Sequence, residues 1–183
     1  MNQTNSFDEV PQNNEQQSVL HIIFDWVEPA LTALICAALL FAFVFRTVGV
    51  DGTSMVPTLK SEDRLILTHM FYRPERGDIV VISRAEEGKT PLIKRVIAVA
   101  GDTIEITANK EVFLNGELLD EPYLNISTPA KGCIGQITVP EDHIFVMGDN
   151  RSVSWDSRDI GPVPVSLVMG KASFRLWQDF GVV

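Results

Sequence analysis

The sequence predicts a mostly β fold, a compact antiparallel β-barrel or two-sheet domain preceded by one N-terminal transmembrane helix. Three observations lead to this fold class. An uncharged apolar stretch runs from Pro29 to Phe45. After Asp51, short runs rich in Val, Ile, Thr and Phe alternate with turn residues, and no long helical period follows Pro57. Asn115-Gly116 lies between two apolar runs, which is typical of a two-residue hairpin.

The N-terminal part divides into a tail and an apolar helix. Residues 1–17 are rich in Asn, Gln, Glu and Ser, which predicts a disordered tail. Residues 18–50 are predicted to form a juxtamembrane and transmembrane helix, because about 20 residues rising 1.5 Å each span a hydrocarbon core of about 30 Å. A buried core helix would keep a polar stripe, and a cleaved secretory signal would begin with basic residues. We therefore expect a retained anchor.

Residues 51–183 are predicted to form the β domain, and each of its expected strands is a short run bounded by turn residues. The turns include Arg76-Gly77-Asp78, Gly101-Asp102 and Pro140-Glu141-Asp142. The expected strands are Arg64–Thr68, Asp78–Ser83, Leu92–Ala100, Thr103–Thr107, Glu111–Leu114, Gln136–Val139, His143–Met147 and Val168–Trp177.

Composition excludes several classes of protein. The chain has 183 residues, 45% of them hydrophobic, which excludes a disordered or fibrous chain. Its net charge of -9 argues against a nucleic-acid partner. The two cysteines, Cys36 and Cys133, cannot form a CxxC pair or a four-ligand zinc site, so we expect no metal.

Two segments carry residues suited to nucleophilic chemistry. Ser54 lies in the glycine-bordered loop DGTSMVPTL, where its hydroxyl can be exposed and its backbone N–H can serve an oxyanion. Lys94 lies in the apolar run LIKRVIAVAGD, and strand alternation places it on one face with Leu92, Val96 and Ala98. Burial lowers the pKa of a lysine, and a neutral lysine can act as a general base. Taken singly, each segment is equally consistent with an ordinary loop or an edge-strand lysine.

A third segment, GDNRSVSWDSRDIG, spans residues 148–161 and follows an apolar strand. It contains three aspartates, one asparagine, two arginines and three serines within one loop. A solvated loop is the simplest explanation. The alternative is a fixed polar network that orients a catalytic lysine.

Together and in this order, GTSMVPTL, IKRVIAVAGD and GDNRSVSWDSRDIG closely resemble the signature segments of the type I signal peptidases, peptidase family S26. The resemblance extends from the membrane span to near Gly170, and it is closest to the short single-span bacterial form. It implies a Ser–Lys protease in which Ser54 is the nucleophile and Lys94 the general base, with no cofactor or metal.

The resemblance also implies supporting roles around this pair. Ser154 would hydrogen-bond and position the lysine amine, and Asp156 would support Ser154 and its loop. The other matched positions are the ion-pairing residues Asp149, Arg95 and Arg158, and the walls of shallow pockets for small side chains, Val50, Met55 and Ile93.

The chain departs from the family pattern at Gly52. Some members have a hydroxyl residue two positions before the nucleophile, which helps to form the oxyanion hole, and glycine offers no side-chain donor. The Ser54 backbone N–H would remain in that role. Between Thr107 and Val139 only a small excursion replaces the extra β domain of larger members.

The implied activity is that of a membrane-bound serine endopeptidase that removes signal peptides from exported preproteins, cutting after small residues in an Ala-x-Ala pattern. Its partners would be signal peptides, the lipid bilayer and the translocation machinery. The implied location is the cytoplasmic membrane, single-pass, with residues 51–183 outside the cytoplasm. Charge alone favours the opposite orientation, because Arg46, Lys60 and Arg64 follow the span and no base precedes it.

Three other functions remain as alternatives. A self-cleaving Ser–Lys domain like that of SOS-response repressors would be soluble. A membrane-anchored β domain that only binds partners would need neither Ser54 nor Lys94. A Ser–His–Asp hydrolase would use His69 or His143, but neither lies in a nucleophile-elbow pattern.

Overall fold

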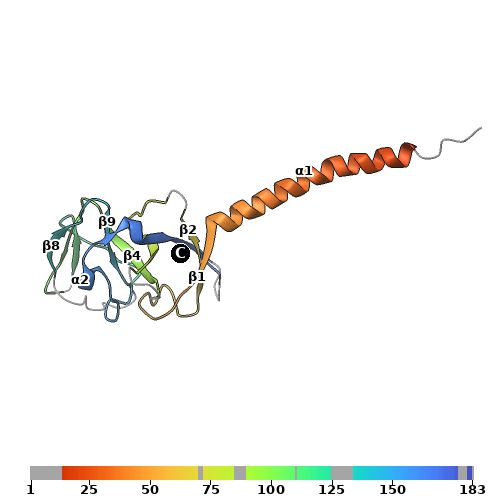
Figure 1. Cartoon of the computed structure of the whole chain (residues 1–183). Helices are drawn as coiled ribbons and strands as arrows, with labels where there is room; N and C mark the ends of the chain where they lie inside the picture. The colour runs from red at the N-terminus through yellow and green to blue at the C-terminus, as the bar shows by residue number, and fades with distance from the viewer. Residues whose placement is uncertain are drawn as a thin grey trace, which may run out of the picture. The chain divides into compact units, whose positions relative to one another are not determined.

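The computed structural model describes residues 14–69, 72–84, 90–109, 111–124, 134–176 and 181–182. The chain divides into two units, residues 1–43 and residues 44–183. The first unit contains the helix α1, and the second contains all the strands (Figure 1). The predicted mostly β body with one apolar N-terminal helix is confirmed.

Helix α1 runs from Asn14 to Val44. Within it, Phe24–Phe41 has a mean hydropathy of 1.6 and is long and apolar enough to cross a membrane. None of that stretch is buried against protein, unlike the core helix of a soluble domain. The helix begins four residues before the expected Ser18, and the rest of the predicted tail, residues 1–13, lies outside the described residues.

The body consists of two antiparallel sheets. The larger has the order β1-β2-β11-β3-β4-β9-β10, with β12 paired to β11, and the smaller has the order β7-β6-β5-β8. The larger sheet is built from β1 (Phe45–Gly49), β2 (Arg64–Thr68), β3 (Ile79–Ile82), β4 (Leu92–Val99), β9 (His143–Met147), β10 (Val163–Pro164), β11 (Val168–Arg175) and β12 (Gly181–Val182). The smaller is built from β5 (Thr103–Ile106), β6 (Val112–Leu114), β7 (Glu117–Leu118) and β8 (Ile134–Thr138). A helical turn, α2 (Ser157–Ile160), and a 3-10 turn, η1 (Val165–Leu167), precede β11.

Strand β1 differs from the sequence interpretation, which assigned residues 45–50 to the membrane segment. In the structure this segment pairs with β2, with Thr47 opposite Ile66 and Val48 opposite Leu65. The β-branched residues Thr47 and Val48 favour this extended pairing. Hydrophobicity alone does not mark the change, because the apolar run continues from the helix into the strand. The strands β10 and β12 and the turn α2 were not predicted, because two to four residues are too few to display a period.

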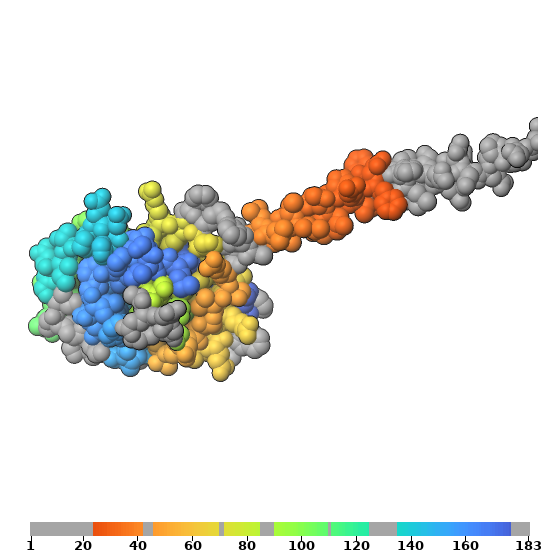
Figure 2. Space-filling model, viewed as in Figure 1, coloured from red at the N-terminus to blue at the C-terminus, as the bar shows by residue number. Residues whose placement is uncertain are grey.

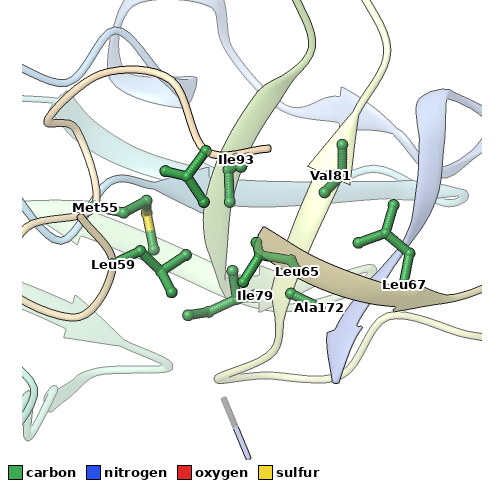
Figure 3. Packing of buried hydrophobic residues seen from close by; sticks show 9 residues of the cluster. Met55, Leu59, Leu65, Leu67, Ile79, Val81, Ile93 and Ala172 are labelled. Atoms are coloured by element: carbon green, nitrogen blue, oxygen red, sulfur yellow. The ribbon is translucent and has the colours of Figure 1, made fainter. Parts of the chain in front are cut away.

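The loop after β1 is fixed to the larger sheet by a buried apolar cluster (Figure 3). Met55 and Leu59 project from that loop onto Leu65 of β2, Ile79 of β3 and Ile93 of β4. Burying one such side chain contributes about 1.5–3 kcal/mol. The apolar residues on either side of Ser54 therefore anchor the loop that carries it.

A bulge in β4 corrects the predicted strand alternation. The pairing of β4 with β9 shifts register between Val96 and Ala98. Leu92 and Val96 belong to one buried cluster, while Ala98 packs beside Ile97 in another. Ala98 therefore does not share the face of Lys94, because the extra residue resets the two-residue period.

Candidate active site

Ser54 and Lys94 meet although they come from different parts of the fold. Ser54 lies on the loop between β1 and β2, and Lys94 lies in β4 opposite Val80 of β3. The Nζ of Lys94 is 2.8 Å from the Oγ of Ser54 and donates to the carbonyl oxygen of Ile93 at 2.9 Å. In Figure 2, yellow-green atoms from near residue 90 lie between orange atoms from the β1–β2 segment and blue atoms from the C-terminal part of the body.

The amine of Lys94 is held in an environment that favours its neutral form. Only 2% of the residue is exposed. Burial is the main cause that lowers its pKa to about 8, with Arg158 and Arg84 lowering it further and Asp156 and Asp149 opposing them. About a tenth of such a lysine is neutral at pH 7, against a few parts in ten thousand for a free lysine. The neutral amine has a lone pair available for the Ser54 proton.

The segment after β9 holds the Ser54 loop through its backbone. The N–H of Asn150 donates to the carbonyl oxygen of Ser54 at 2.9 Å, and its side-chain amide donates to that of Thr53 at 3.2 Å. The hydroxyl of Thr58 donates to Asp149. These bonds restrain the nucleophile loop from both sides of Ser54.

Gly148 allows the two loops to approach closely. A Cβ added there would lie less than 3.0 Å from the Oγ of Ser154 and from the carbonyl oxygen of Ser54. The position therefore excludes every residue with a side chain unless the catalytic loops move apart.

Ser154 and Asp156 form the buried end of this segment, and both are 0% exposed. The carboxylate of Asp156 accepts from the N–H of Gly148 at 2.9 Å and from two nitrogens of Arg158, each at 2.8 Å. Burial raises the pKa of Asp156, but the hydrogen bonds and charge of Arg158 outweigh it and hold the pKa below its usual value. Among the described residues, the Oγ of Ser154 is buried and forms no hydrogen bond of good geometry, so the expected bond to Lys94 is not formed in this structure. The hydroxyl lies near Asp156 and helps to lower the pKa of that carboxyl.

Asp149 and Arg95, expected to form ion pairs, pair with each other. The Arg95 guanidinium donates from Nε at 2.9 Å and from Nη2 at 2.7 Å to the two oxygens of Asp149. It also lies 4.0 Å from the centre of the Tyr123 ring. The bidentate geometry fixes Arg95 beside Lys94 on β4.

Arg151 and Glu121 are structural members of the site that sequence reasoning missed. Arg151 is 2% exposed, pairs through both terminal nitrogens with the carboxylate of Glu121, and donates from Nε to the carbonyl oxygen of Gly148 at 3.1 Å. Tyr123 donates to the same carboxylate at 2.6 Å. The arginine was visible in the third motif, but its partner lies in a separate loop with no motif of its own.

The residues expected to wall the substrate pockets are largely buried. Val50, Met55 and Ile93 are 6%, 1% and 8% exposed and belong to the same apolar cluster. Gly52 has a φ of 98°, a conformation that strains any other residue. The backbone conformation at this position therefore favours glycine over a residue with a hydroxyl side chain.

The other candidate groups lie elsewhere. His143 begins β9, and its Nδ1 contacts the carbonyl oxygen of Glu141 at 2.8 Å, while His69 follows β2. Across the residues that the structure describes, no group of three or more His, Cys, Asp or Glu could hold a metal ion. Cys36 lies exposed in α1, and Cys133 is outside the described residues.

Comparisons with known proteins identify the family of the chain. The family model described as signal peptidase, peptidase S26, matches residues 23–177. The chain is 37% identical to signal peptidase I of Bacillus licheniformis, over 83% of this chain and 87% of the relative. It is 41% identical to signal peptidase I P of Bacillus subtilis subsp. natto, over 75% and 79% of the two chains. The structure of a signal peptidase I from Enterococcus faecalis V583 aligns with 55% of this chain and 97% of its own, at 31% identity and a TM-score of 0.46. The family match covers the apolar stretch of α1 and the three motifs, and the chain belongs to the signal peptidase family, peptidase S26.

Proposed function

We propose that this protein is a membrane-anchored serine endopeptidase that removes signal peptides from exported preproteins with a Ser54–Lys94 dyad. The relatives are named signal peptidase I, which supports signal-peptide removal as the activity. The observation that carries the mechanism is the 2.8 Å contact between the buried Lys94 amine and the Ser54 hydroxyl.

The reaction follows from the protonation state of Lys94. The neutral amine takes the Ser54 proton as Oγ attacks the scissile carbonyl carbon, and the negative charge moves to the carbonyl oxygen. The backbone N–H of Ser54 donates to this oxyanion. The Lys94 ammonium then protonates the leaving nitrogen, the C–N bond breaks, and an ester to Ser54 remains. A water that gives its proton to Lys94 hydrolyses the ester and restores the hydroxyl.

Supporting residues keep this geometry. Ser154 Oγ and the Ser54 carbonyl oxygen both lie close to Gly148, and we propose that this Oγ binds the Lys94 amine when the amine turns toward substrate. Asp156 and Arg158 fix the loop that carries Ser154. Arg95 and Asp149 fix the neighbouring backbone. We assign positioning roles to all five.

Substrate preference follows from the small exposed fractions of the pocket residues. We propose that Val50, Met55 and Ile93, of which only small edges are exposed, wall pockets that accept methyl-sized side chains. A larger side chain would displace atoms of the apolar core, which costs about 1–3 kcal/mol. We therefore expect cleavage after small residues in an Ala-x-Ala pattern.

The anchor helix places enzyme and substrate in the same bilayer. Tethering raises the effective concentration of the cleavage site, so weak pocket contacts suffice. The exported substrate requires the β body to lie outside the cytoplasm, with the bilayer and the translocation machinery as partners. Protease added to intact spheroplasts should digest the body, and protection of the body would refute this orientation.

The decisive experiment compares variants of the full chain in detergent on a precursor with one Ala-x-Ala site. Ser54→Ala and Lys94→Ala should each lower kcat/KM by about a thousandfold or more. Ser166→Ala and Lys60→Ala change the same residue types at exposed positions and serve as matched controls. Activity that survives Lys94→Ala but is lost in His69→Ala or His143→Ala would replace the dyad with a histidine mechanism.

A further inference from the structure

A pocket of about 370 Å³ is lined by sequence neighbours of Lys94 and Ser154 and is not used by the mechanism above. Its wall includes Leu92, two residues before Lys94 on the same face of β4, and Trp155, which directly follows Ser154. The end of β3 and the segment from α2 to η1 complete it. The pocket therefore shares strand β4 with Lys94 and the segment after β9 with Ser154.

The lining combines an apolar surface with one charge. Among the described residues that line the pocket, Arg84 alone is charged, and its guanidinium lies 4.8 Å from the centre of the Trp155 ring. Such a stacked arginine keeps N–H groups at its edge with which it can bind a carboxylate. The other apolar lining residues are Ile82, Leu92, Ile160, Pro162, Val163, Pro164 and Leu167.

Two of the lining residues expose unusually large apolar surfaces. Trp155 is 43% exposed and Ile160 is 44% exposed. A tryptophan at the rim of an apolar pocket is a rigid contact surface for a bound chain, and such residues often dominate binding energy. This explains the position of Trp155 in the third motif better than a packing role does.

The location of the pocket indicates which part of a substrate it meets. Val50, Met55 and Ile93, assigned to residues before the cleaved bond, belong to the first apolar cluster. Ile82, Leu92 and Val163 belong to a different cluster, on the opposite face of the β3–β4 pair. Lys94 lies opposite Val80 of this second cluster, so the amine projects from the same face of β4 as the pocket.

We propose that this pocket binds the first residues of the mature protein after the cleaved bond and favours an acidic residue there. The proposal rests on the signal-peptidase function proposed above. Arg84 supplies the charge complementarity and Trp155 the contact surface. The net charge of -9 repels acidic peptides in general, so a preference for them has to come from a local cation.

The test uses the full chain in detergent and peptides identical up to an Ala-x-Ala site. In each peptide one of the first four positions after the cut carries Glu, Gln or Lys, so that all four positions are tested in turn. For the parent, we expect kcat/KM at one position to be about two- to fivefold higher with Glu than with Lys, as for a partly exposed ion pair. Arg84→Glu should reverse this order. Arg64→Glu makes the same charge change on the exposed side of β2, and this variant should still prefer Glu to Lys.

The ratio of Glu to Lys substrates within one variant cancels any effect of Arg84 on Lys94. An equal ratio in the parent and in Arg84→Glu would overturn the proposal while leaving the protease function intact. The peptides also bind to Ser54→Ala, which does not cleave them, and this binding is measured by fluorescence. A comparison with Ser54→Ala/Trp155→Phe tests the pocket without turnover. A Glu preference in binding with no cleavage by the parent would keep the pocket and refute the proposed function.

Discussion

The Nζ of Lys94 lies 2.8 Å from the Oγ of Ser54, and in the described part of the chain no carboxylate forms an ion pair with this amine. The two nearby carboxylates are already engaged, Asp149 by Arg95 and Asp156 by Arg158. Burial is the main cause that lowers the pKa of Lys94, and neither carboxylate pairs with it, so the lysine loses its proton more easily than a lysine in water.

The pH dependence of cleavage should report the ionisation of Lys94. Its pKa is lowered to about 8, and only the neutral amine accepts the Ser54 proton. We expect kcat/KM to rise with pH and level off above pH 8. Arg84→Ala removes a charge that lowers this pKa, so the midpoint should move to higher pH. An activity that is flat from pH 6 to pH 9 would contradict the lysine mechanism.

The same pKa predicts how stability varies with pH. Between a folded pKa of about 8 and an unfolded value of 10.5, the unfolded chain binds more protons, so the stability of the parent rises with pH in this window. Lys94→Met removes the buried charge and should be more stable than the parent at pH 7. The difference should shrink by about 2–3 kcal/mol toward pH 10.5. Lys60→Met, at an exposed position, should show no such trend in denaturant unfolding.

Ser154→Ala should separate activity from stability. The Ser154 hydroxyl is buried and forms no hydrogen bond of good geometry, although it lies near Asp156, so its removal should change the free energy of unfolding by no more than about 1 kcal/mol. If the hydroxyl binds the Lys94 amine during the reaction, as we propose, its loss should lower kcat and alter the pH midpoint, with KM little changed. Unfolding curves and pH–rate profiles of the purified variant measure both. A large loss of stability would instead indicate a packing role.

Gly148→Ala should damage the dyad through backbone contacts. The added methyl group cannot be accommodated unless Ser154 or the Ser54 carbonyl moves. We expect a destabilisation of about 1–3 kcal/mol and a fall in kcat of up to about a hundredfold. The matched control is Gly135→Ala, where a Cβ meets nothing within 4 Å. Similar kinetics for both variants would show that the close approach is not required.

The Glu121–Arg151 pair should behave as one unit. Glu121→Gln leaves the Arg151 guanidinium buried without its carboxylate, which costs about 3 kcal/mol. Arg151→Met should also destabilise, and the double variant should lose much less than the sum of the two. Glu117→Gln, on the exposed β7, is the control. Strict additivity in chemical denaturation would show that the two residues are not coupled.

The sequence was most informative where a residue has its own local signature. Strand β2 was predicted residue for residue, because it is a short apolar run bounded by turn residues. Lys94 was correctly expected to share a face with Leu92 and Val96. The prediction failed at Ala98, because a bulge depends on the neighbouring strand and leaves no mark in the strand that contains it.

Long-range pairing was beyond the sequence. Arg95 and Arg158 were expected to form ion pairs, but the choice of Asp149 for one and Asp156 for the other is set by the fold. Glu121 could not be connected to Arg151, because it lies in a separate loop outside every motif. The start of β1 was hidden by the apolar run of α1, since hydrophobicity continues where the secondary structure changes.

The arginines around Lys94 have an effect that reaches beyond structural support. Arg95 and Arg158 pair with Asp149 and Asp156, the two carboxylates whose charge raises the pKa of Lys94, and Arg158 also lowers this pKa directly. The pH range in which Lys94 is neutral is thus set in part by two arginines that are not assigned to substrate binding. Adaptation to a more acidic or more alkaline exterior can proceed by changes at these pairs, while Ser54 and Lys94 stay as they are.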